Sequence, residues 1–440
     1  MRMICFISAM SLSALFFPFP RPVSAQEAAT ATPQSSESNR PKIKFDDYLN
    51  EVVRHNLDLA IQRTNIAISQ AGVTSAKERP DWSADIGFPS ADLSNQGFPT
   101  TWSAGLNVPI ELGGKQKKRV RAATADVATT NSDYQDALRQ SRAAAAEAFI
   151  DSLGSREILQ SKQKSLGEFD RIVQVNEERV RVGDIGEIEL VQSRVNRDQF
   201  RADVITARAD VISADLALAQ QLGQPAKLSS QLPVPVGRLE IANRTFNVDE
   251  LVASSFQLRP DVISKSHALK AAELRIDLAK TNLIPDMSFG GSFAHTGVGT
   301  GDFLQPVDNV LSFGLSVNVP VSRLRYQGEV EAARATRTQA ELQLSAAQLQ
   351  AETEVRSAYS RYQASVQRLE LYRSGMLKNA DRVLEARLYA YQRGGATLLE
   401  VIDAERTSAD VYLSYSQALV ENAHALVALE QAAGIWDVSF

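Results

Sequence analysis

The chain has 440 residues, of which 44% are hydrophobic and 22% charged, and its formal net charge is −5. This composition is typical of a folded protein and excludes a disordered chain, a collagen-like repeat and a disulfide scaffold. The mildly acidic charge gives no basic footprint for nucleic acid, and a single cysteine excludes a cysteine-rich metal cluster.

The first 25 residues have the pattern of a secretory signal peptide. Arg2 supplies a short positive region, residues 4–19 form an apolar segment, and Val-Ser-Ala at 23–25 is typical of a cleavage site. A membrane anchor is the alternative interpretation, although the apolar segment is too short to span a bilayer comfortably. We expect cleavage before Gln26, which removes Cys5 and exports the remaining chain.

A duplication organises the rest of the sequence. Asn-Val-Pro at 107–109 recurs at 318–320, and Ala-Lys at 76–77 recurs at 279–280, in the same order and at a spacing of about 205 residues. The sequence therefore predicts two halves with one plan. The expected divisions are a flexible segment at 26–41, a first repeat at 42–222, a linker at 223–245, a second repeat at 246–434 and a tail at 435–440.

The first half predicts helices on both sides of a pair of strands. A helix over 46–79 is followed by strands at about 81–90 and 101–110, in which large apolar residues alternate with small polar ones. The stretch 115–182 contains no proline and predicts a helix on the order of 100 Å long. After a break at Gly183, a further helix of about 40 residues follows.

The second half predicts the same series. Strands are expected at about 286–295 and 311–321, and a long helix is expected over 326–393. The glycine pair 394–395 interrupts the helical pattern, and a last helix ends near Gly434.

The four strands favour a membrane barrel shared between chains. Each is near the length of about 9–11 residues that crosses a bilayer, and spanning strands must close because lipid leaves no edge unpaired. About eight strands is the smallest bacterial barrel, so several copies must combine their strands. A four-stranded sheet in a soluble domain is the alternative. In the membrane interpretation, four aromatic side chains face lipid: Trp82, Trp102, Phe289 and Phe313.

The sequence contains no recognisable catalytic or metal-binding grouping. The four histidines, at 55, 267, 295 and 424, are scattered without ligand spacing, and no phosphate-binding glycine loop or Ser-His-Asp grouping occurs. We therefore expect no enzymatic activity, no metal site and no cofactor.

Two segments at the helix reversals carry a family resemblance. Residues 391–404 (YQRGGATLLEVIDA) and 181–189 (RVGDIGEIE), together with the duplicated strands and helices, resemble the TolC family of outer-membrane efflux proteins over essentially the whole exported chain. Residues 108–115 (VPIELGGK) are similar to a stretch common in the CzcC-like heavy-metal efflux branch.

The resemblance implies an α+β membrane fold and a transport function. It implies a homotrimer with a 12-stranded barrel in the Gram-negative outer membrane, continued by a long periplasmic α-helical barrel. It also implies docking to a periplasmic adaptor and an inner-membrane pump, for which an RND type is expected, in a tripartite efflux or type I secretion-like system. The exported substrate stays open between metal cations, organic toxicants and polypeptides. The alternative is a soluble periplasmic coiled-coil scaffold.

The resemblance also implies the functional positions. Glu400 and Asp403 lie three apart, so they share one helical face, and three copies would form acidic rings that gate the pore. The first repeat has Glu189 and Gln192 at the corresponding places. A solvated helical face is the alternative for the acidic pair. Adaptor contact is expected at the two tips, at Arg181, Gly183, Asp184, Tyr391, Arg393, Gly394 and Gly395.

Basic residues follow the second and fourth strands. Positive charge at a helix start opposes the macrodipole, so an outside partner is expected, namely anionic phospholipid headgroups on the periplasmic leaflet of the outer membrane, with simple solvation as the alternative. These residues are Lys115, Lys117, Lys118, Arg119 and Arg121 after the second strand, and Arg323 and Arg325 after the fourth.

Overall fold

The computed structural model describes residues 40–88, 101–223, 232–296, 308–320, 322–438 and 440. The expected signal peptide lies outside the described residues, as do nearly all of the segment 26–41 and part of the linker 223–245. Within the described residues, no helix combines the length and the apolar character needed to cross a membrane.

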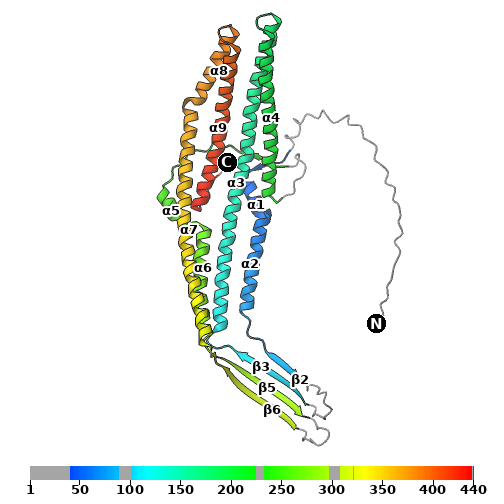
Figure 1. Ribbon diagram of the computed structural model, residues 1–440, viewed down its shortest axis with the longest axis vertical. Helices are drawn as coiled ribbons and strands as arrows, with labels where there is room; N and C mark the ends of the chain where they lie inside the picture. The colour runs from blue at the N-terminus through cyan, green and yellow to red at the C-terminus, as the bar shows by residue number, and fades with distance from the viewer. Residues whose placement is uncertain (1–39, 89–100, 224–231, 297–307, 321, 439) are drawn as a thin grey trace, which may run out of the picture.

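Two long helical hairpins stand on a four-stranded sheet (Figure 1). The hairpin tips lie at one end of the molecule and the sheet lies at the other. The elements before the first hairpin's end are β1 (Lys42–Lys44), α1 (Phe45–His55), α2 (Leu57–Ala76), β2 (Ser83–Gly87), β3 (Thr101–Ile110), α3 (Lys115–Arg181) and α4 (Glu187–Gln221). Those that follow are β4 (Val234–Val236), α5 (Val248–Leu258), α6 (Pro260–Thr281), β5 (Asp286–Thr296), β6 (Asp308–Asn318), α7 (Arg323–Leu371), the π-helical segment η4 (Tyr372–Met376), α8 (Leu377–Gln392) and α9 (Leu398–Ala433).

The first long helix is confirmed as one element. α3 runs without interruption for 67 residues, which corresponds to about 100 Å. It packs against α4 within its own hairpin and against α2, α6 and α9 elsewhere. One continuous helix therefore joins the sheet to the tip of the first hairpin.

Two expected helices are wrong as single elements. The stretch 46–79 divides at Asn56, whose backbone is extended (φ −63°, ψ 125°) and whose side chain accepts hydrogen bonds from the backbone N–H groups of Asp58 and Leu59. Asn56 thus caps α2, which is a local alternative to continuing α1. The stretch 326–393 divides at η4, where Gly375 leaves the helical conformation. Figure 1 shows α8 bent away from the line of α7.

The larger sheet is antiparallel with strand order β2-β3-β5-β6, so the strand pairs of the two halves meet at β3 and β5. β2 is shorter than the predicted range 81–90, the last two residues of which lie outside the described part. β6 begins at Asp308 and ends at Asn318, whereas the sequence predicted 311–321. Among the residues that the structure describes, the two outer strands of this sheet, β2 and β6, have no further strand beside them.

The main hydrophobic core lies in the middle of the molecule, where the lower helices meet the hairpins. Phe149 of α3 and Leu426 of α9 are completely buried there, together with Tyr48 of α1. The ring of Phe45 packs edge-on against Phe149, with 5.3 Å between ring centroids. A short parallel pair of strands, β1 and β4, borders this region and aligns Lys42 with Val234.

Candidate functional site

The tip of the first hairpin reverses the chain between α3 and α4. Gly183 has φ +78°, a conformation that glycine adopts without a Cβ penalty, and open space surrounds the position of its missing Cβ. Arg179 Nε donates to Asp184 Oδ2 at 2.6 Å and fixes the turn, while Arg181 pairs with Glu178. Arg181, Gly183 and Asp184 are all exposed.

The tip of the second hairpin is held by a reciprocal cap at the start of α9. The Thr397 backbone N–H donates to Glu400 Oε2 at 2.9 Å, and the Glu400 backbone N–H donates to Thr397 Oγ1 at 3.3 Å. Gly394 has φ +76° and makes the turn. Arg393 is exposed, and its guanidinium lies 4.0 Å from the centre of the Tyr389 ring.

The two predicted gate residues lie on the first turns of α9, but in different environments. Glu400 accepts from Thr397 and also from Arg387, with Nη1 3.0 Å from Oε1. The hydrogen bond from the Thr397 backbone, followed by the charge of Arg387, lowers the pKa of Glu400 below its ordinary value. The Asp403 side chain is exposed to solvent. Glu400 therefore stabilises the tip through its hydrogen bonds and ion pair, whereas the carboxylate of Asp403 is exposed to water.

Tyr391 differs from the other predicted tip residues because its side chain is buried between the hairpins. It is 4% exposed, and its hydroxyl donates to Asn176 Oδ1 of α3 at 2.6 Å. Arg179 lies over its ring, 4.5 Å from the centroid, and donates to its carbonyl oxygen. Burial raises the pKa of Tyr391, and the charge of Arg179 partly offsets this. The residue joins the second hairpin to the first.

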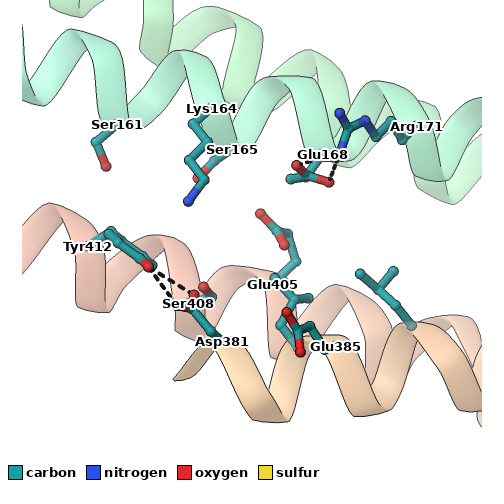
Figure 2. A pocket seen from close by; sticks show the side chains of 12 residues that line it. Ser161, Lys164, Ser165, Glu168, Arg171, Asp381, Glu385, Glu405, Ser408 and Tyr412 are labelled. Atoms are coloured by element: carbon teal, nitrogen blue, oxygen red, sulfur yellow. Dashed lines mark hydrogen bonds and ion pairs between the residues drawn. The ribbon is translucent and has the colours of Figure 1, made fainter. Parts of the chain in front are cut away.

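Below the tips, a cavity of about 380 Å³ separates α3 from α8 and α9 (Figure 2). Glu405 projects into it from α9, opposite Glu168 of α3. The sequence interpretation missed Glu405, although a signal was present: Leu398, Val401 and Ile402 are buried, and Glu405 continues their helical spacing. Asn176 and Arg179 were also missed, because their partner at position 391 is more than 200 residues away.

The sheet separates side chains by chemistry. Its register puts Leu106 beside Gly291, and Phe289 beside Leu315, so one face carries most of the large apolar residues of the four strands. Trp102, Phe289 and Phe313 lie on this face. Trp82, one residue before β2, is 69% exposed. The other face carries the serines, Asn107, Asn318 and several of the glycines, and Ser288 and Ser316 hydrogen-bond across it at 2.6 Å.

Several basic residues at the start of α3 have partners within the chain. Lys115 Nζ lies 2.6 Å from Asp286 Oδ2, and Arg119 pairs with Glu111 through both carboxylate oxygens. Lys118 donates to the carbonyl oxygen of Asp277 at 3.1 Å. Carboxylates next to the strands therefore compensate Lys115 and Arg119, and a backbone carbonyl of α6 binds Lys118. Contact of this basic segment with lipid headgroups stays a prediction.

The comparisons with known proteins agree with this geometry. The sequence signature described as "Outer membrane efflux protein" matches residues 49–224 and 251–435. The chain is 23% identical over 393 residues to the outer membrane efflux protein BepC of Brucella suis. This alignment covers 87% of this chain and 83% of BepC. It is 22% identical over 334 residues to the cobalt-zinc-cadmium resistance protein CzcC of Cupriavidus metallidurans. This alignment covers 76% of this chain and 77% of CzcC.

Solved structures share the fold. The outer membrane protein VceC of Vibrio cholerae superimposes with a TM-score of 0.73 at 18% identity, covering 89% of this chain and 96% of VceC. The outer membrane channel CmeC of Campylobacter jejuni superimposes with a TM-score of 0.72 at 17% identity, covering 94% of both chains. The expected fold class is thereby confirmed.

Proposed function

Because the chain belongs to the outer membrane efflux protein family, we propose that three copies of it assemble into one exit duct. Members of this family are outer-membrane components of tripartite efflux systems, and this protein is an efflux channel rather than an enzyme. It resides in the outer membrane with a large periplasmic helical part. We also propose that residues 1–25 are removed on export and that 223–245 links the repeats 42–222 and 246–434.

The observation that carries the proposal is the two-faced sheet with unpaired outer strands. An apolar face suits lipid and a face of small polar residues suits a water-filled lumen. Within the described part of one chain, β2 and β6 have no outer neighbours. Pairing β2 of one copy with β6 of the next closes a barrel of about twelve strands and removes every edge, as lipid requires.

The tips supply the proposed contact with a periplasmic adaptor. Large apolar side chains are exposed on both: Val182 and Ile188 around the first turn, and Leu399 after the second. With the exposed tip residues Arg181, Gly183, Asp184, Arg393, Gly394 and Gly395, they form a surface that favours a partner. We propose that Tyr391 contributes to this surface by holding the tips together. An RND-type pump is the proposed energy source beyond the adaptor.

The acidic pair at the start of α9 supplies the proposed gate. Three copies of Glu400 and Asp403 would ring the constricted end of the duct and favour cations. Arg387 pairs with Glu400 and not with Asp403. In this proposal, Asp403 therefore carries most of the cation selectivity. The similarity to CzcC supports cations as the exported substrate class, and with them the metal-efflux branch.

Single-channel recording in a planar bilayer tests the proposal. The purified protein should give small, cation-selective openings. Asp403→Asn should reduce the cation selectivity more than the matched variant Glu400→Gln, and removing both carboxylates with Glu400→Ala plus Asp403→Ala should enlarge the openings. A protein that is soluble without detergent and gives no conductance would contradict the channel and favour the periplasmic scaffold.

A further inference from the structure

The cavity between the hairpins contains a buried carboxyl oxygen that has no hydrogen-bond partner among the described residues. Glu405 is 2% exposed, and its Oε2 atom has no hydrogen-bond partner among the described residues. A buried polar atom without a partner costs free energy, so this atom points to a ligand or to a proton that neutralises the group. The side chain reaches across the gap from α9 toward α3 (Figure 2).

The charged groups around Glu405 are engaged elsewhere. On α3, Glu168 pairs with Arg171 at 2.9 Å, and the ammonium of Lys164 lies 4.5 Å from the centre of the Tyr412 ring. On α8, Asp381 accepts from the Tyr412 hydroxyl at 2.8 Å, and Glu385 also lines the cavity. Acidic groups therefore outnumber basic ones in the lining.

The neighbouring arginine on α9 turns away from the cavity. Arg406 donates to Asn196 Oδ1 on α4 at 2.6 Å and to Gln199 Oε1 at 3.4 Å. It lines the separate pocket on the α4 side, together with Asp203 and Lys162. The nearest guanidinium in the sequence thus provides no counter-charge for Glu405.

A proton fits this site better than a metal ion. Among the residues with described positions, no three His, Cys, Asp or Glu side chains come together in a way that could hold a metal. Burial, with the charge of Glu168, raises the pKa of Glu405 to about 7, and Lys164 opposes the shift. Glu405 accordingly binds or releases a proton within the range that a periplasm experiences.

We propose that Glu405 is a proton-operated latch between the two hairpins. With the proton bound, a neutral carboxyl fills the cavity and α9 stays against α3. When the proton leaves, the carboxylates of Glu405 and Glu168 repel across the cavity, and the second hairpin loosens from the first. The contact between hairpins does not depend on the proposed function, whereas its effect on conductance does.

The direction of the pH dependence follows from the raised pKa. In separated hairpins Glu405 is hydrated and titrates near its ordinary value of 4.5. The closed contact is therefore fully favoured in acid and weakens as the pH rises from about 4.5 to about 7. Over that interval the ratio of closed to open contacts should fall by about two orders of magnitude per chain, since each pKa unit is a factor of ten.

Amide hydrogen exchange on the purified full-length protein measures the latch directly. Exchange is recorded between pH 4.5 and 8 and corrected for the intrinsic effect of pH. In the unmodified protein, protection of α8 and of the start of α9 should fall as the pH rises, while α2 serves as an internal reference. Glu405→Gln, which stays neutral, should abolish this fall.

Two substitutions around Glu405 should move the midpoint in opposite directions. Glu168→Gln removes the charge that raises the pKa of Glu405, so the midpoint should move to lower pH. Lys164→Gln removes the charge that lowers it, so the midpoint should move to higher pH. Glu385→Gln is the matched control in the same cavity and should leave the midpoint in place.

The outcomes separate the latch from the channel. A pH response unchanged by Glu405→Gln, or midpoints that do not move with Glu168 and Lys164, would overturn the latch even if the protein conducts. The expected exchange pattern in a protein that does not conduct would support the latch and contradict the proposed function.

Discussion

The two helical hairpins come from one duplicated pattern but are built differently. The rising leg of the first is the single helix α3, whereas that of the second is interrupted by η4 and continues as the short helix α8. At the start of its returning helix the first hairpin carries Glu189 and Gln192, and the second carries Glu400 and Asp403. From this difference we propose that the first hairpin is a stiff frame and that the second hairpin is a movable arm with two acidic residues at its tip.

The largest expected effect comes from removing the contact that Tyr391 of the second hairpin makes with the first hairpin. Tyr391→Ala removes a buried aromatic ring and its hydrogen bond to Asn176, which should weaken the contact between hairpins by about 3 kcal/mol. Channel openings should become larger and longer in bilayer recordings. Tyr389→Ala is the matched control, because Tyr389 is 55% exposed. Equal effects of the two substitutions would show that Tyr391 does not join the hairpins.

The cap at the start of α9 gives the next largest expected effect. Thr397→Ala removes the side-chain oxygen that accepts from the Glu400 backbone, at an expected cost of about 1 kcal/mol. The first turn of α9 should then exchange its amide hydrogens faster, while α4 stays unchanged. Thr397→Ser, which keeps the hydroxyl, should behave like the original. Slower amide hydrogen exchange in the first turn of α9 in Thr397→Ala would contradict the role of Thr397 as a cap.

Substitution of one glycine in each rising leg compares the helix α3 of the first hairpin with the interrupted helix of the second hairpin. Gly375→Ala in η4 and Gly167→Ala in α3 each replace glycine by a better helix former, favouring the helix by about 0.8 kcal/mol. Open space surrounds the position of a Cβ at 167, and the nearest atom at 375 is 3.8 Å away. Only Gly375→Ala should reduce channel opening, because only at position 375 does a stronger helical preference oppose a bend. A reduced opening in Gly167→Ala would place the movable region in α3 instead.

The smallest expected effect lies at the first tip. Gly186 precedes α4 with φ −77° and provides no side-chain cap. Gly186→Ser gives α4 a capping oxygen and should stabilise its start by a few tenths of a kcal/mol. Slower hydrogen exchange at residues 187–190, with unchanged conductance, would agree with a first hairpin that is already rigid. A change in conductance would show that this tip also moves.

Much of the fold follows from short-range signals in the sequence. Alternating apolar and polar residues predicted the strands, and a long proline-free stretch predicted α3. The break at 56 was missed because the apolar pattern continues across Asn56, although an asparagine two residues before an aspartate is a capping signal. The Ser374-Gly375 pair was likewise a signal for a bend.

The candidate site was less predictable because its contacts join distant segments. Asn176 meets Tyr391 only once the hairpins have packed in register, and Lys115 meets Asp286 across 171 residues of sequence. No local pattern specifies such pairs. Glu405 is the exception, since the helical spacing of its buried neighbours already placed a carboxyl on the inner face.

The parallel pairing of β1 with β4 has a consequence for the order in which the chain folds. Lys42 is aligned with Val234, so this pairing closes a loop that contains the whole first hairpin. Closing a loop of that length is slow relative to forming its helices, and it cannot begin before residues 234–236 have been delivered. An exported chain therefore crosses the inner membrane with its first half still open, and β1 can pair only when the linker that contains β4 has been delivered.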